Sequence, residues 1–340
     1  MEKVKIGIIG AGRIGRLHAE NIVHIPQVEI KTISDLFVEN LQEWANKIGI
    51  QNVTSDYNDI LNDSEIDAVF ICSPTNTHLS IIRDAAKAGK HIFCEKPISF
   101  STEETKEALK IVKETGVKLQ VGFNRRFDKH FKKVHDTVKE GVVGEPQLVK
   151  ITSRDPDPPP AEYIKSSGGL FVDMAIHDYD IARYVTGSEV VEVYVQGANL
   201  IDPAIGDLGD IDTALTILKF ENGALGVIDN SRKAVYGYDQ RVEVFGSKGS
   251  VANQNEQPTN VVVNTVDGIY QEKLKNFFLD RYKDAYLEET HAFIQSVLYD
   301  TPLVCKGEDG LEAELIAEAA KASLLTKQPV KIKREEYKLV

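Results

Sequence analysis

Short apolar runs alternate with amphipathic stretches through the first third of the chain, and the lengths fit strands and helices. The run at 66–72 is apolar almost without interruption, which is typical of a strand buried on both faces of a parallel sheet. Residues 1–123 are therefore predicted to form a doubly wound α/β domain. Strands are predicted at 5–9, 30–34, near 53, 66–72, 91–94 and 118–123, and helices through 22 and at 38–47, 57–61, 79–88 and 102–115.

This alternation stops after residue 123, and the remaining pattern predicts an α+β domain over 124–340 with a large, mostly antiparallel open sheet. The last helix can pack back on the first domain. The proline-rich segment 154–160 is predicted to be a loop. Strands are predicted at 146–153, 190–197, 212–220, 224–232, 241–246, 260–265 and 330–332, and helices up to 140, from 172 onward, and at 282–298 and 310–325.

The predicted strand at 212–220 carries apolar side chains on both of its faces, so that both faces need cover. Helices can cover one face of the sheet. A second copy of the chain can cover the other, and we therefore expect a homo-oligomer.

Charge and cysteine content narrow the class of protein. The 340 residues include 40 Lys plus Arg against 52 Asp plus Glu, a net charge of −12, so a nucleic-acid partner is not expected. No apolar run approaches the length that spans a membrane, and no membrane partner is expected. Cys72, Cys94 and Cys305 are far apart in the sequence, which suits a reducing compartment and offers neither a disulfide framework nor a structural zinc site. A cytoplasmic protein is expected.

The segment Gly10-Ala11-Gly12-Arg13-Ile14-Gly15 lies between the first predicted strand and the first predicted helix. Gly10 permits a tight turn, Gly12 lets a pyrophosphate approach the backbone, and Gly15 allows the helix to pack closely on the strand. The N-terminus of the helix supplies hydrogen-bond donors and the positive end of its dipole. This context predicts a Rossmann dinucleotide-binding domain.

Asp35 ends the second predicted strand, where a carboxylate hydrogen-bonds the ribose hydroxyls of the adenosine. A 2′-phosphate about 4 Å away would be repelled by up to roughly 4 kcal/mol per charge at an effective dielectric constant near 20. Leu36 and Phe37 follow, and no arginine stands there to bind a phosphate. The sequence therefore favours NAD over NADP.

In such sheets the ligand lies beyond the carboxyl ends of the strands, so that Ser73–Asn76 and Lys96 are expected to border the cofactor. Lys96 is followed by a proline that restricts it, and is a candidate functional cation. We expect His78 to be structural rather than catalytic and Cys72 to be a buried packing residue. The full set expected at the cofactor site is Gly10, Gly12, Arg13, Ile14, Gly15, Asp35, Leu36, Cys72, Ser73, Pro74, Asn76, His78, Glu95 and Lys96.

A second constellation lies in the segment predicted to be helical from Val172 onward. Asp173 and His177 are four residues apart, and His177 and Asp180 are three apart, which places all three on one face of a continuous helix. An imidazole between two carboxylates suits a general base, because one acid can orient the ring and offset its positive charge. The alternative is that these are solvated residues on an exposed helix.

A nicotinamide site, a His–Asp pair and a lysine together specify oxidation of an alcohol. His177 would take the hydroxyl proton, Asp173 would orient the ring, and Lys96 would stabilise the developing alkoxide. This chemistry needs no metal, and the scattered Cys and His residues do not match zinc-ligand spacing.

Further side chains are candidates for binding the substrate. Asp180, with Asp155 and Tyr236 as looser candidates, could exchange hydrogen bonds with additional hydroxyls. Because carboxylates are good acceptors for hydroxyl donors, such a site suits a neutral polyol and suits an acidic substrate badly.

Three segments resemble signatures of the Gfo/Idh/MocA oxidoreductase family: Gly10–Gly15, Glu95–Pro97 and Asp173–Asp178. The resemblance extends over essentially the full chain, and within the family it is greatest to bacterial inositol 2-dehydrogenases, supported by 123–128, 153–156 and 231–238. It implies oxidation of myo-inositol to 2-keto-myo-inositol (scyllo-inosose) with reduction of NAD, in a homotetramer built through the sheet of the second domain. It also implies a catalytic set of Lys96, Asp173 and His177, with Asp180 and Tyr236 contacting the sugar.

The loop after Arg154 departs from the family pattern, because some relatives carry a histidine near there and this chain has Asp155-Pro156-Asp157. The sequence therefore leaves open whether the substrate is myo-inositol, scyllo-inositol or a glucose-like pyranose. A more distant alternative is a non-catalytic, NAD-responsive regulatory protein. Lys96, Asp173 and His177 disfavour it, because a sensor has no use for these three residues.

Overall fold

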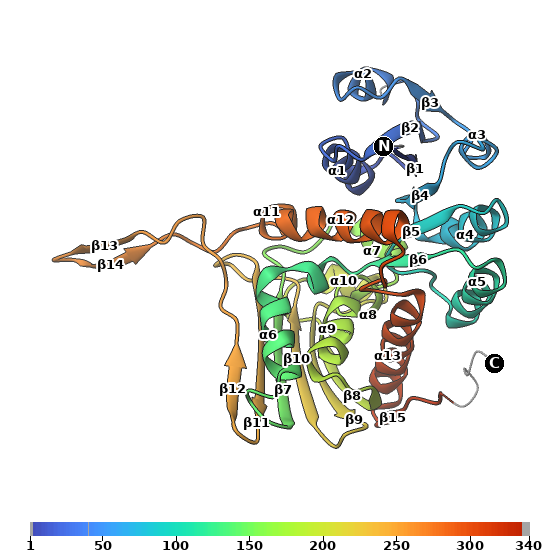
Figure 1. Ribbon diagram of the computed structural model, residues 1–340. Coiled ribbons are helices and arrows are strands. Elements are labelled where there is room, and N and C mark those ends of the chain that lie inside the picture. Colours follow the sequence, from blue (N-terminus) through green and yellow to red (C-terminus); the bar gives the residue numbers. More distant parts are fainter. Residues whose placement is uncertain (1–2, 40, 335–340) are drawn as a thin grey trace. The chain divides into compact units, whose positions relative to one another are not determined.

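The computed structural model describes residues 3–39 and 41–334. The chain divides into two compact units, which are described separately (Figure 1). The first contains the described chain up to Phe127 and the segment Asp284–Glu314, and the second contains Asp128–Lys283 and the described chain from Leu315 onward. The first unit thus includes the segment Asp284–Glu314, which lies far beyond residue 123, the predicted end of the first domain.

A six-stranded parallel sheet forms the centre of the first unit, in the order β3-β2-β1-β4-β5-β6. The predicted doubly wound α/β fold is confirmed. The predicted helix at 38–47 begins only at Leu41, and residue 40 lies outside the described part of the chain. The strands are β1 (Val4–Ile9), β2 (Val28–Ser34), β3 (Asn52–Thr54), β4 (Ala68–Ile71), β5 (His91–Glu95) and β6 (Leu119–Gly122), and the helices are α1 (Arg13–Ile22), α2 (Leu41–Lys47), α3 (Asn58–Leu61), α4 (His78–Lys87) and α5 (Thr102–Thr115).

Aromatic packing joins this sheet to helix α12 (Lys283–Tyr299). Phe70 on β4 pairs in register with Phe93 on β5, and their rings stack with centroids 4.7 Å apart. Phe293 of α12 meets Phe70 edge-on at 5.3 Å. All three side chains are fully buried, so α12 shares the hydrophobic core of the sheet.

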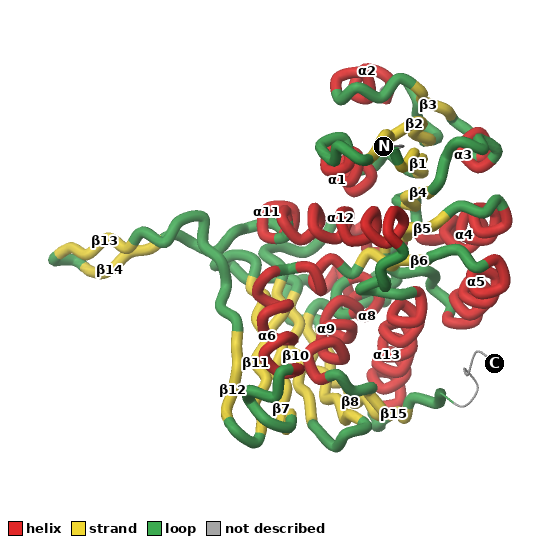
Figure 2. The backbone as a smooth tube through the Cα atoms, in the orientation of Figure 1, coloured by secondary structure: helices red, strands yellow, loops and turns green. Residues whose placement is uncertain are grey.

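The second unit contains a seven-stranded sheet in the order β12-β11-β7-β10-β9-β8-β15. Only the β10–β7 pair is parallel, which confirms the predicted large, mostly antiparallel sheet. Helices α6 (Lys129–Lys139) and α9 (Ile176–Thr186) pack against its strands (Figure 2). The strands are β7 (Pro146–Arg154), β8 (Val190–Ala198), β9 (Thr213–Phe220), β10 (Leu225–Ser231), β11 (Asp239–Gly246), β12 (Gly249–Ala252) and β15 (Val330–Lys331).

Strand β9 shows how this sheet is covered. Its side chains alternate between buried positions, such as Leu218 and Phe220, and the half-exposed apolar Leu215 and Ile217. One face of the sheet is therefore packed within the unit, and the other presents apolar side chains to solvent.

Several sequence predictions for the second unit need correction. The predicted strand at 260–265 does not join the large sheet, because β13 (Val262–Thr265) pairs only with β14 (Gly268–Gln271) in a two-stranded hairpin (Figure 1). Short elements with little hydrophobic pattern were missed, among them α7 (Ala161–Ser166) and α10 (Pro203–Asp207).

The predicted helices near the C-terminus correspond to α12 and α13 (Gly307–Thr326). Within the described residues, no helix is long and apolar enough to cross a membrane.

Candidate functional site

The glycine-rich loop joins β1 to α1, and its geometry shows why glycines are needed there. Gly10 has a φ of +95°, and a Cβ atom at this position would lie 2.6 Å from the backbone nitrogen of Ser73. A Cβ on Gly15 would lie 1.9 Å from the carbonyl oxygen of Gly10. A Cβ on Gly12 would meet nothing within 4 Å, so this glycine leaves open space above the backbone. The loop therefore has the close packing and the exposed backbone that a pyrophosphate site requires.

Asp35 follows β2 and is tied to the glycine-rich loop. Its Oδ2 accepts a hydrogen bond from the backbone nitrogen of Ala11 at 2.7 Å, and its Oδ1 accepts one from the backbone nitrogen of Phe37 at 2.9 Å. Each carboxylate oxygen keeps a second lone pair, so these contacts leave acceptors for ribose hydroxyls. Leu36 and Phe37 are strongly exposed beside it.

The loop after β4 is held by His78. The two ring nitrogens of this buried imidazole lie 2.9 Å from the carbonyl oxygens of Ser73 and Pro97, and the neutral ring donates its one N–H to one of them. Burial lowers the pKa of His78, against the opposing effect of these two carbonyls. His78 therefore holds the chain after β4 to the chain after β5, where Lys96 and Pro97 are joined by a cis peptide bond. This is a structural role.

The residues that follow Lys96 and Pro97 are anchored by Glu314, in the part of α13 that belongs to the first unit. Its Oε1 accepts from the backbone nitrogens of Ile98 at 2.7 Å and Ser99 at 3.2 Å, and its Oε2 accepts from Thr105 Oγ1 at 2.5 Å. Burial nevertheless raises the pKa of Glu314 to about 8, because it outweighs the three donors. The sequence did not identify Glu314, which lies more than two hundred residues from its partners.

The remaining cofactor candidates belong to the same unit. Cys72 is half-buried against the core of this unit, and desolvation raises the pKa of its thiol well above the ordinary value. Ser73 Oγ lies 2.6 Å from Thr77 Oγ1, within the turn that precedes α4. Arg13, Pro74 and Asn76 are exposed, whereas Ile14, Glu95 and Lys96 are half-buried.

In the second unit, the continuous helix predicted from Val172 is wrong. Helix α8 (Leu170–Asp173) ends at Asp173, Met174 and Ala175 form a turn, and α9 begins at Ile176. The backbone nitrogens of Met174 and Ala175 both bond the carbonyl oxygen of Leu170, so the regular helical hydrogen-bond pattern is interrupted there. Asp173 and His177 therefore lie on two helices, and the argument from a shared helical face does not hold for this pair. His177 and Asp180 both lie on α9.

Asp173 is held by two side chains that the sequence analysis did not single out. Its Oδ1 accepts a hydrogen bond from the hydroxyl of Tyr163 at 2.8 Å, and its Oδ2 lies 3.3 Å from Nη1 of Arg232. Arg232 is fully buried, and its Nη2 lies 3.3 Å from Asp210. The guanidinium therefore offsets the charges of two carboxylates at once. Arg232 lies in the segment 231–238, which resembles the inositol 2-dehydrogenases. It is 59 residues from Asp173, so no local sequence pattern indicates that the two are paired.

The other substrate candidates differ in exposure. Asp180 is fully buried, with Arg183 Nη1 at 3.9 Å, whereas His177 is half-buried on the same helix. Tyr236 is partly exposed; its hydroxyl donates to Asp239 at 2.7 Å and accepts from Arg154 at 3.0 Å.

Asp155 is joined through its backbone to the chain that follows β10. Its nitrogen donates to the carbonyl oxygen of Ser231 at 2.9 Å, and its carbonyl accepts from the nitrogen of Ala234 at 2.7 Å. The structure thus places Lys96 at the end of β5 in the first unit, and Asp155, Asp173, His177, Asp180 and Tyr236 in the second.

The cofactor site has the features expected for a dinucleotide: an open Gly12 backbone, a helix beginning at Arg13 and a carboxylate at the end of β2. This loop, on a six-stranded parallel sheet, defines the class of Rossmann-fold dinucleotide-binding proteins. A family model described as an oxidoreductase family with an NAD-binding Rossmann fold matches residues 4–123, and the GFO/IDH/MocA C-terminal domain matches residues 131–252. The chain belongs to the Gfo/Idh/MocA family of NAD-dependent oxidoreductases.

Individual relatives match nearly the whole chain. An uncharacterized oxidoreductase of Bacillus subtilis strain 168, YrbE, is 56% identical over 335 residues, 98% of each chain. The myo-inositol 2-dehydrogenase of Thermotoga maritima is 48% identical, covering 97% of this chain and 98% of the relative. Among solved structures, scyllo-inositol dehydrogenase from Lactobacillus casei with bound NAD(H) and scyllo-inositol matches with a TM-score of 0.91 and 32% identity, covering 97% of this chain and 99% of that one.

Proposed function

We propose that this chain is an NAD-dependent inositol 2-dehydrogenase that oxidises myo-inositol to 2-keto-myo-inositol (scyllo-inosose). The observation that carries the proposal is the match to a myo-inositol 2-dehydrogenase at 48% identity over 97% of the chain. The contacts of Asp173 support it, because Tyr163 and Arg232 hold this carboxylate in one orientation. Asp173 precedes His177 by four residues.

The proposed roles follow from proton and charge requirements. NAD, when bound, accepts the hydride from the carbon that is oxidised. His177 takes the proton from the hydroxyl on that carbon, and Asp173 orients the imidazole and offsets its charge once it is protonated. Lys96 stabilises the negative charge that develops on the oxygen.

Hydroxyl-rich substrates fit the polar groups of the second unit, because carboxylates accept hydrogen bonds from hydroxyls. We propose Asp155, Asp180 and Tyr236 as the groups that bind the remaining ring hydroxyls. Scyllo-inositol, whose reacting hydroxyl is equatorial rather than axial, is the second candidate substrate. The similarity to a scyllo-inositol dehydrogenase at 32% identity favours it over a glucose-like pyranose.

The test is NADH production by the purified protein with myo-inositol, scyllo-inositol, other inositol isomers and aldoses. Turnover of myo-inositol with the highest kcat/KM is expected. Preference for scyllo-inositol would replace the first candidate by the second. Binding of NAD without turnover of any of these compounds would refute the proposal and favour a regulatory protein.

Variants test the catalytic roles. His177→Ala should lower kcat by about 10²–10⁴, the usual contribution of a general base. His24→Ala, at an exposed histidine, is the control and should keep the kcat of the unmodified protein. If Lys96 acts in the same step, Lys96→Ala combined with His177→Ala should lose less than the product of the single effects. An unchanged kcat in His177→Ala would contradict its role as the base.

We propose further that the protein is a cytoplasmic homotetramer. Half-exposed Leu215 and Ile217, together with Leu148, Leu225 and Phe245 on neighbouring strands, give the sheet of the second unit an apolar surface that a second copy could bury. Ile217→Asp should lower the mass measured by light scattering after size-exclusion chromatography. Lys87→Asp introduces the same side chain at an exposed position of α4 in the first unit, and should leave the assembly intact. A monomeric unmodified protein would contradict the proposal.

A further inference from the structure

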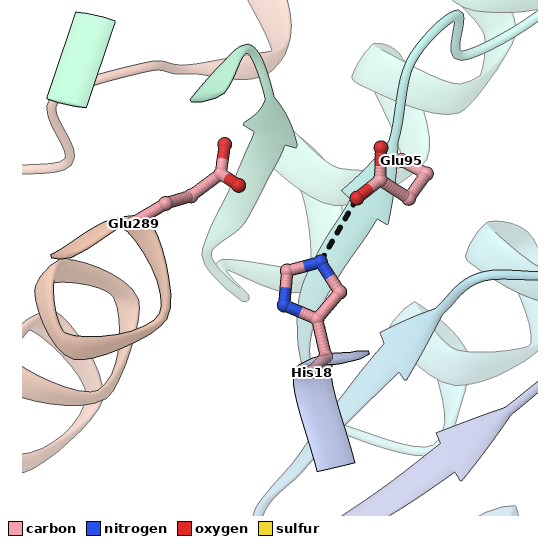
Figure 3. Close-up of side chains that lie close together, drawn as sticks. All are labelled: His18, Glu95 and Glu289. Carbon is pink, nitrogen blue, oxygen red and sulfur yellow. Dashed lines mark hydrogen bonds and ion pairs between the residues drawn. The ribbon is translucent and has the colours of Figure 1, made fainter. Parts of the chain in front are cut away.

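Three titratable side chains from separate segments converge in the interior of the first unit: His18 on α1, Glu95 at the end of β5 and Glu289 on α12 (Figure 3). One ligand atom from each lies within 4.8 Å of the others. His18 and Glu289 are fully buried, and the Glu95 side chain is 14% exposed. Figure 3 shows the Glu289 carboxyl directed toward the other two side chains. The cluster is therefore an interior feature and differs from an acidic surface patch.

The hydrogen bonds of His18 define which ring nitrogen faces the carboxylates. The hydroxyl of Thr290 donates to the backbone carbonyl of Tyr286 at 2.9 Å, so its oxygen accepts from Nδ1 of His18 at 3.0 Å. Nδ1 therefore carries a proton, and Nε2 is the nitrogen that lies 2.9 Å from Oε1 of Glu95. Metal-binding histidines are oriented in this way, with one ring N–H bonded to a neighbouring acceptor and the other nitrogen available as a ligand.

Glu289 is the member of the cluster that most needs a compensating charge. Neither of its carboxyl oxygens has a hydrogen-bond partner among the described residues. Burial, and to a lesser degree the negative charge of Glu95, hold its pKa well above the ordinary range. A buried carboxyl without a partner is costly, and a cation beside it would remove that cost.

We propose that His18, Glu95 and Glu289 bind a divalent transition-metal ion, and that zinc is the ion best suited to this ligand set. One imidazole and two carboxylates are ligands that zinc accepts, at about 2.0–2.2 Å. A neutral imidazole, two carboxylates and a divalent cation give a site of zero net charge. The three ligands leave a coordination position for water.

The proposed ion has a structural role. It would join α1, β5 and α12, and would thereby fix the segment Asp284–Glu314 to the sheet of the first unit. It takes no part in hydride transfer, so it is compatible with chemistry that needs no metal. The competing arrangement is two protons, one on Glu289 and one between His18 and Glu95, which gives the same net charge.

Metal content distinguishes the two arrangements. The full chain, without a polyhistidine tag, is unfolded in denaturant with a chelator, refolded with or without zinc, freed of loose metal and analysed by mass spectrometry for zinc. The proposal predicts about one zinc ion per chain and a higher melting temperature in the zinc-refolded protein, because an ion that binds only the folded state stabilises it. Refolding with cobalt(II) should give the visible absorption of a low-symmetry nitrogen- and oxygen-coordinated ion.

Two variants provide the matched comparison. Glu289→Gln has the shape of the protonated acid, and it should fold but lose the zinc, the zinc-dependent rise in melting temperature and the cobalt absorption. His24→Gln changes an exposed histidine near the end of α1 and should retain all three. Absence of zinc from the unmodified protein refolded with zinc would overturn the proposal in favour of two protons. Equal zinc content and cobalt spectra in Glu289→Gln and the unmodified protein would also overturn it.

Discussion

The anchoring carboxyl Glu314 gives a prediction about pH-dependent stability. Its pKa is raised from an ordinary value of 4.5 to about 8 in the folded protein, chiefly by burial. Between these two values the folded protein binds a proton that the unfolded chain releases, so stability falls as the pH rises. Below the lower value both states are protonated, and above the upper value both are ionised, so Glu314 contributes no slope in either range.

The size of the effect follows from the same two values. Each unit of difference in pKa corresponds to about 1.4 kcal/mol, so Glu314 lowers the free energy of unfolding by about 5 kcal/mol in all across this pH range. Glu314→Gln cannot ionise. Its side-chain oxygen can still accept from Ile98 and Ser99, and its amide nitrogen can donate to Thr105. The variant should therefore resemble the protonated protein and gain up to about 5 kcal/mol relative to the unmodified protein from pH 5 to pH 8.

The measurement is urea unfolding at constant ionic strength and several pH values from 5 to 8.5. The single tryptophan, Trp44 on α2, lies in the same unit as Glu314, so its fluorescence reports the unfolding of that unit. Glu318→Gln, at an exposed position farther along α13, is the control, and its curve should parallel that of the unmodified protein. If the Glu314→Gln curve also stays parallel, then the three donors keep Glu314 ionised throughout and the argument from burial is wrong.

Two further predictions concern the cofactor site. Gly15→Ala should destabilise the protein by about 3 kcal/mol or more, because its Cβ would overlap the Gly10 carbonyl. Gly12→Ala should keep the melting temperature of the unmodified protein but weaken NAD binding measured by calorimetry. Equal melting temperatures for the two variants would contradict this. Asp35→Ser combined with Leu36→Arg should raise kcat/KM with NADP at least tenfold relative to NAD, because a carboxylate that repels the 2′-phosphate is removed and a cation is added. An unchanged preference for NAD would show that Asp35 does not bind the ribose.

The fold was largely predictable because its signals are local. The glycine-rich loop, the apolar runs of β1 and β4 and the amphipathic α5 each specify an element within a short window. The predicted strand at 260–265 rested on the apolar run at 261–263, and apolar runs also mark the strands of the two larger sheets. Such a run does not specify the partner of a strand, so it did not show that β13 pairs with β14 in a separate hairpin.

The candidate site was predictable as a set of residues and less so as a set of contacts. Asp173 and His177 stand out by residue type, but the inference that they share a helix depended on an unbroken helical pattern. Met174 and Ala175 are good helix formers, and nothing in their side chains indicates a break. The contacts between Asp173 and the side chains of Tyr163 and Arg232 arise from tertiary packing, which overrides local propensity here.

The motifs that carry the chemistry are local, but their side chains and backbone are held by charged or polar partners from distant segments. His18 bonds Glu95, Glu314 binds the backbone that follows Lys96, and Arg232 lies between Asp173 and Asp210. Each of these three partners is almost completely buried. Removing one partner of a buried pair is far more costly than the net contribution of the pair, because it leaves the other group desolvated and unpaired. Loss of Arg232 would leave two carboxylates without their shared cation. The geometry of each motif therefore depends on residues that no local pattern would select.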